Sequence, residues 1–98
     1  MIRVVYRWRV SSHNFDEFNR VWKQTTDHIH ESVAGAFGSL MLRSIDEKSE
    51  IVTIAKWDSL ASWESFWGNE NPIQMKKMHQ IAKRMSVEVF EEVADRTG

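Results

Sequence analysis

Apolar and polar residues alternate along the first ten positions of the chain, which is the pattern of a β-strand with two different surroundings. One face of this strand would carry Ile2, Val4, Tyr6, Trp8 and Val10. The other face would carry Arg3, Val5, Arg7 and Arg9. Because successive side chains of a strand point to opposite sides, the pattern predicts a buried face and a charged face.

An amphipathic helix is expected next, because the period of the apolar positions changes from two residues to three or four. Asn14 and Glu17 have the spacing of a capping box, which marks a helix start, and Gly35 supplies a stop. The apolar stripe between them consists of Phe15, Phe18, Val21, Trp22, Thr25, Ile29 and Val33. The sequence therefore predicts a helix that packs one face against the sheet.

Two short runs rich in β-forming residues follow, at 39–44 after Gly38 and at 51–57, and the polar link 46–48 between them suits a hairpin. Asp58 or Ser59 can cap a second helix, which Gly68, Asn69 and Asn71 then interrupt. The apolar stripe of that helix is Leu60, Trp63, Phe66 and Trp67.

A third helical piece is predicted over residues 72–84, with Asn71 as its cap and Pro72 in its first turn. Its stripe carries Met75, Met78, His79 and Ala82. Residues 85–93 alternate again and predict a last strand, and 94–98 read as a loose tail.

This order of elements predicts an α+β, ferredoxin-like βαββαβ fold with a four-stranded antiparallel sheet and both helical layers on one face. The first and last strands then lie side by side, so the three arginines stand near Glu88 and Glu92. The helix-free face would also carry Val5, Met41 and Phe90. A mixed face of this kind is typical of an interface, so we expect a homodimer that closes two sheets into a dimeric α/β barrel.

Composition narrows the class of protein. The 98 residues suit a single domain over 1–98, whose small core also favours oligomerisation. With 13 basic and 14 acidic residues, no net field exists to attract nucleic acid. Cysteine is absent, and no apolar run is long enough to cross a membrane. We therefore expect a soluble, cytoplasmic protein without thiol or disulfide chemistry.

The whole layout resembles the antibiotic biosynthesis monooxygenase (ABM) family of dimeric α/β barrels. Four segments carry the resemblance: VVYRWRV in the first strand, FDEFNRVW in the first helix, GAFGSLMLRS before the hairpin, and IAKWDSLASWESFW at the end of the third strand and into the second helix. The resemblance covers nearly all of the chain. It implies a ligand site between sheet and helices, in a fold that carries quinone-forming oxygenases, haem-degrading enzymes and proteins without assigned chemistry.

The haem-degrading branch of this superfamily uses an Asn on the first strand, a Trp on the second helix and a later His. The resemblance places Tyr6, Trp67 and His79 at these positions, and Tyr6 departs from the pattern. Haem degradation is therefore not expected, although haem binding through His79 remains an alternative. For the cofactor-free oxygenases, the resemblance implies aromatic walls around the substrate, for which Trp22, Trp63 and Trp8 are candidates.

The leading hypothesis is a monooxygenase that needs no cofactor or metal and acts on a small aromatic or polyphenolic ligand. Its candidate catalytic residues are Tyr6, Trp67 and His79, the last as an acceptor of a phenolic proton. Core packing explains Tyr6 and Trp67 equally well, and a lone His on an apolar stripe, such as His79, is more often a hydrogen-bonded core residue. A non-enzymatic ligand-binding or scaffold protein is therefore the alternative. His28 and His30 are two residues apart on a helix and therefore cannot easily share a metal; we expect both to be solvent-exposed.

Overall fold

The computed structural model describes residues 1–68 and 72–98. Its elements follow the predicted βαββαβ order, with two short 3-10 helices added. They are β1 (Ile2–Arg9), η1 (Ser12–Asn14), α1 (Phe15–Ser32), β2 (Ala36–Arg43), β3 (Glu50–Trp57), α2 (Leu60–Trp67), η2 (Ile73–Met75), α3 (Lys76–Ile81) and β4 (Lys83–Glu91).

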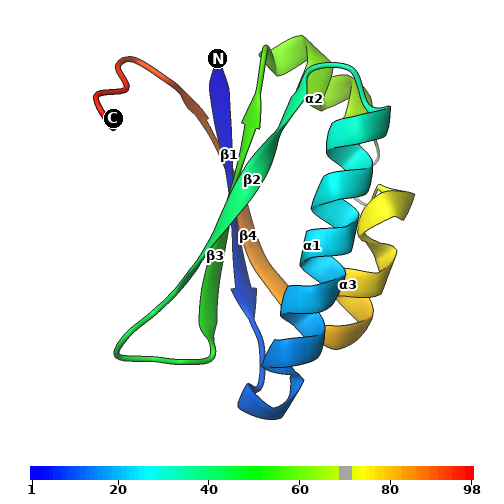
Figure 1. The fold of residues 1–98 in the computed structure, drawn as a ribbon, viewed down its shortest axis with the longest axis vertical. Coiled ribbons are helices and arrows are strands. Elements are labelled where there is room, and N and C mark those ends of the chain that lie inside the picture. The colour runs from blue at the N-terminus through cyan, green and yellow to red at the C-terminus, as the bar shows by residue number, and fades with distance from the viewer. Residues whose placement is uncertain (69–71) are drawn as a thin grey trace.

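The four strands form one antiparallel sheet in the order β2-β3-β1-β4. The first and last strands are therefore neighbours, as predicted. Figure 1 shows that α1, α2 and α3 all lie on one side of this sheet. The ferredoxin-like fold is confirmed. Within residues 1–68 and 72–98, no helix combines the length and the apolar character needed to span a bilayer.

The core lies between the sheet and the helices. The five residues predicted for the inner face of the first strand, Ile2, Val4, Tyr6, Trp8 and Val10, are all buried. Phe18 and Val21 of α1 and Met78 of α3 cover them from the helical side. The Trp8 indole N–H donates a hydrogen bond of 3.1 Å to Oγ1 of Thr53 on β3, and both residues are buried. This buried polar pair is therefore satisfied, as burial requires.

The start of α1 differs from the prediction. Asn14 has φ −101° and ψ −3°, and its side chain makes no capping hydrogen bond, so the predicted capping box with Glu17 is wrong. The cause is the η1 turn, which already coils the chain before the helix, whereas a capping residue needs an extended backbone. At α2 the prediction holds, because the Ser59 hydroxyl accepts a hydrogen bond from the backbone N–H of Ser62.

The helix predicted over 72–84 ends earlier, at Ile81, and β4 runs from Lys83 to Glu91 instead of over 85–93. Lys83 and Arg84 pair with Arg9 and Trp8 of β1, and the register then shifts between Arg7 and Trp8. This irregularity interrupts the alternation of apolar residues and so hides the start of the strand. The predicted roles of Asn69 and Asn71 lie outside the described residues.

A second irregularity, between Ala36 and Ser39, lies near the start of β2, where Gly38 has φ +106°. The strand begins at Ala36, earlier than predicted. The shift in pairing changes which side chains face the helices, and it places Met41 opposite Thr53 on the helix-covered face. The prediction that Met41 lies on the free face is wrong. Leu40 and Leu42, whose partners are Ile54 and Val52, take that side instead.

The free face of the sheet combines apolar side chains with ion pairs. Leu40, Leu42 and Phe90 remain 44%, 53% and 49% exposed. Two predicted pairings are confirmed: Arg3 Nε lies 2.8 Å from a carboxylate oxygen of Glu92, and Arg7 Nε lies 2.8 Å from one of Glu88.

The third arginine of the series pairs differently. Arg9 bonds to Glu50 of β3 and not to a glutamate of β4. The register explains this correction, because Arg9 lies opposite Glu50 on one side and opposite Lys83 on the other.

Replacement of Gly35 tests how closely the α1–β2 turn packs on α2. Gly35 has φ +89°, and an added Cβ would lie 2.5 Å from Asp58 Oδ1 and 2.7 Å from Ser62 Oγ. Gly38 has a positive φ but open space around its Cβ position. We expect Gly38→Ala to lower the free energy of unfolding by about 1–3 kcal/mol through backbone strain. Gly35→Ala should cost roughly 1–3 kcal/mol more through steric overlap.

Urea unfolding of the two variants and the wild type measures this difference. Equal stability of the two variants would show that Asp58 and Ser62 move aside freely.

Candidate functional site

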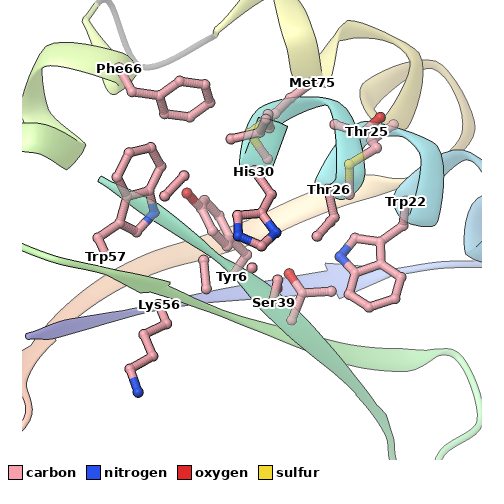
Figure 2. Close-up of a pocket in the computed structure, with 16 residues that line it drawn as sticks. Tyr6, Trp22, Thr25, Thr26, His30, Ser39, Lys56, Trp57, Phe66 and Met75 are labelled. Carbon is pink, nitrogen blue, oxygen red and sulfur yellow. The ribbon is translucent and has the colours of Figure 1, made fainter. Parts of the chain in front are cut away.

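A cavity open to solvent lies between α1 and the sheet. Together with the open space at its mouth it measures about 470 Å³, of which about 50 Å³ is accessible to the centre of a water-sized molecule. β1, β2 and β3 supply its floor and α1 its roof, as Figure 2 shows in close-up. Its aromatic lining residues are Tyr6, Trp22, Trp57 and Phe66. Among its polar lining residues are Thr25, Thr26, His30, Ser39 and Thr53. A mostly apolar cavity with a few polar groups is the usual form of a small-molecule site.

Tyr6 brings a buried hydroxyl to the lining of this cavity, and only 5% of its surface is exposed. The indole N–H of Trp63 donates a 3.2 Å hydrogen bond to the Tyr6 hydroxyl oxygen. Burial raises the pKa of Tyr6 to about 12, against the smaller opposing effects of Trp63 and Arg84. The phenol therefore keeps its proton at neutral pH and can donate a hydrogen bond to a ligand.

The candidate residues separate into two groups. Tyr6 and Trp22 line the cavity, whereas Trp8, Trp63, Trp67 and His79 are not among its lining residues. Those four form an aromatic cluster beside Tyr6. In this cluster Trp63 stacks on Trp67 with 5.2 Å between ring centroids, and Trp67 lies 5.8 Å from the Tyr6 ring. The cluster therefore surrounds and orients the Tyr6 ring.

His79 belongs to this cluster and is half-buried, with its ring 5.4 Å from that of Trp8. The guanidinium of Arg84 lies over Trp67 and has Nη1 3.2 Å from Nε2 of His79. Since an arginine can only donate, Nε2 accepts, which places the proton of the neutral imidazole on Nδ1. Burial, together with the charge of Arg84, lowers the pKa of His79. Because Nε2 of His79 already accepts a hydrogen bond from Arg84, this nitrogen is poorly suited to bind a haem iron.

Sequence reasoning missed several residues of the cavity, among them His30 with its imidazole. Its residue surface is exposed, as expected for both His28 and His30, yet the His30 ring lines the cavity. Trp22, Thr26 and His30 recur every four residues and therefore share one face of α1. That spacing was the available signal. Trp57 and Phe66 also line the cavity and lie 5.1 Å apart between ring centroids.

Across residues 1–68 and 72–98, no group of three or more His, Cys, Asp or Glu side chains is placed to hold a metal ion.

Comparison with known proteins assigns the family. The sequence model of the family described as "Antibiotic biosynthesis monooxygenase" matches residues 1–79. The chain belongs to this family. No curated protein gives a sequence match. The remaining comparisons are with solved structures, which bear on the fold that ABM proteins share.

Three such structures illustrate the likeness. SnoaB, a cofactor-independent oxygenase from Streptomyces nogalater, is 18% identical with a TM-score of 0.75, over 98% of this chain and 94% of that one. Rv0793 from Mycobacterium tuberculosis is 12% identical with a TM-score of 0.72, over 98% of each chain. A conserved protein from Methanosarcina mazei Go1 is 13% identical with a TM-score of 0.70, over 91% and 89%. At these identities the likeness establishes the ABM fold.

Titration of Tyr6 tests the burial of the cavity floor of this ABM protein, and the chain has a single tyrosine. We expect its phenolate absorbance to appear only as the pH approaches about 12, against the ordinary value of 10.0. The raised pKa stabilises the fold below pH 10, and this contribution is lost as the pH rises towards about 12, since the unfolded chain ionises first.

Ultraviolet titration of native and guanidinium-unfolded protein measures both values. A native value equal to the unfolded one would mean that the hydroxyl is solvated.

Proposed function

We propose that this chain is a cofactor-independent monooxygenase that oxygenates a small phenol-type aromatic substrate. The observation that carries the proposal is the aromatic-walled cavity over β1, with the protonated Tyr6 hydroxyl at its floor. Membership of the ABM family and the fold shared with SnoaB, a cofactor-independent oxygenase, support the reaction class.

The reaction needs no electron source besides the substrate. A phenolate is electron-rich enough to pass an electron to dioxygen, and the resulting radical pair can combine at a ring carbon. That carbon loses its one hydrogen and gains one oxygen atom, so that the ring becomes a quinone with two carbonyl groups. The second oxygen atom leaves as water with this hydrogen and one proton, which balances the proton lost from the phenolic hydroxyl. The protein's part is to position the ring and to replace water around it with fixed dipoles.

The residues divide this work according to their places. Trp22, Trp57 and Phe66 form apolar walls for a flat ring, and the Tyr6 hydroxyl donates a hydrogen bond to the substrate oxygen. The other candidates act behind Tyr6. Trp63 holds the hydroxyl through its indole N–H, and Trp67 packs against the Tyr6 ring. His79 supports this cluster through Trp8 and Arg84.

Oxygen uptake tests the activity directly. The purified, chelator-treated protein is mixed with a panel of polyphenols, and at least one should be consumed with uptake of dioxygen. Tyr6→Phe should lower kcat/KM roughly tenfold or more, because a hydrogen bond to a charged oxygen is lost. His28→Gln, on the exposed side of α1, serves as the matched control and should retain full activity.

Absence of uptake with every substrate would favour the alternative, a ligand-binding or scaffold protein. Tryptophan fluorescence quenched by the same polyphenols would then identify ligand binding, since Trp22 and Trp57 line the cavity.

The free sheet face supports a second proposal, that two copies pair through it as a homodimer. The face presents exposed apolar residues on both edge strands, Leu40 and Leu42 on β2 and Phe90 on β4. Its arginines are already neutralised by glutamates of the same chain, so their burial against a second copy would not leave unpaired charges.

Charge introduced on this face should separate the copies. The double variant Leu40→Lys, Leu42→Lys loses apolar contact in both subunits, and we expect its dimer dissociation constant to rise at least about 100-fold. Ile73→Lys is the control, because Ile73 is 80% exposed and lies in η2, on the helical side. Sedimentation equilibrium measures all three proteins, and a well-folded wild-type monomer at micromolar concentration would contradict the dimer.

A further inference from the structure

We propose that His30 is the general base that removes the phenolic proton of the substrate. This assignment rests on the proposed function, and it gives the proton-transfer step to a residue outside the aromatic cluster. The step breaks the substrate O–H bond and forms an N–H bond on the imidazole. The electron pair stays on the substrate oxygen, which becomes the phenolate that reacts with dioxygen.

His30 lies at the mouth of the cavity. It lies in the last turn of α1, and Figure 2 shows its ring directed from that helix into the cavity. The residue is also exposed, so the ring lies at the mouth of the cavity. A base in this place meets the ligand on one side and bulk water on the other. The proton it accepts can therefore leave to solvent between turnovers.

The other polar side chains described as lining the cavity do not supply a base. No Asp or Glu is among the residues described as lining the cavity, so a carboxylate base is lacking there. The Lys56 side chain points away from the cavity in Figure 2. Tyr6 retains its own proton, because burial raises its pKa to about 12. The other polar lining groups are hydroxyls, which are not bases at neutral pH, so the imidazole remains.

The rings of His79 and His30 differ in their hydrogen bonding. His79 has its Nε2 engaged by Arg84, whereas in residues 1–68 and 72–98 no hydrogen bond or ion pair holds the His30 ring. A ring nitrogen of His30 is therefore available to a ligand. The imidazolium formed on proton transfer would lie at the C-terminal end of α1, where the helix dipole favours a positive charge.

A chromogenic phenol separates this inference from the oxygenase proposal. 4-Nitrophenol absorbs visible light only as the phenolate. Its ionisation on binding can therefore be measured by absorbance at neutral pH, in a solution from which oxygen has been removed. When bound to the wild type or to His28→Gln, the probe should have a higher phenolate fraction than the free probe has at the same pH. When bound to His30→Gln, it should be in the neutral form. His28 is on the same helix and is exposed but does not line the cavity, which makes it the matched control.

Turnover gives a second readout. With a polyphenol that the wild type oxidises, His30→Gln should lower kcat about 100-fold or more, the range of a lost general base, and added imidazole should restore part of the rate. Thermal unfolding checks that the variant is folded.

The outcomes are distinguishable. Equal ionisation of the probe by His30→Gln and wild type, or failure of the wild type to ionise it, overturns the role of His30. Oxygen uptake that persists in His30→Gln at the wild-type rate also overturns it and leaves the oxygenase proposal standing. Ionisation that depends on His30, without oxygen uptake by the wild type on any polyphenol, supports the base and refutes the oxygenase.

Discussion

The burial of Trp8, with its indole N–H bonded to Thr53, fixes the rest of the structure. β1 lies between β3 and β4, so its register decides which residues of both neighbours face the helices. A slip of one residue would turn Arg7 and Arg9 into the core and leave the indole donor unsatisfied, which is costly in a dry interior. The same register places Tyr6 under α1, so the constraint that holds the sheet together also sets the cavity floor.

Regular patterns along the chain were sufficient to predict the architecture. The two-residue period of β1 and the helical period of α1 identify their inner faces, because burial of one face is what gives each period its physical meaning. Bulges and turns have no regular repeat of apolar residues from which they could be predicted. The irregular pairing near Gly38 reversed the expected side of Met41, and the one at Trp8 concealed the first residues of β4. Their effect depends on the partner strand, which local sequence does not specify.

The candidate site was predicted less completely, for a different reason. An inward-facing side chain can pack tightly or border empty space, and the sequence does not distinguish the two. Trp67 stacks on Trp63, and His79 accepts a hydrogen bond from Arg84. Tyr6 and Trp22, in contrast, border the cavity. The two-residue spacing of His28 and His30 indicates only that they do not share a metal. The four-residue steps from Trp22 to Thr26 and from Thr26 to His30 are the pattern that places His30 at the cavity.

The roof helix α1 has two halves with different tasks. Phe18 and Val21, in the first half, are buried in the core, while Thr25, Thr26 and His30, in the second, border the cavity. Substitutions at Thr25, Thr26 and His30, which do not belong to the core cluster, therefore remove little core packing and change mainly the shape and polarity of the cavity. A protein built in this way can acquire a new ligand preference through substitutions at these few positions of α1, with little change in its thermal stability.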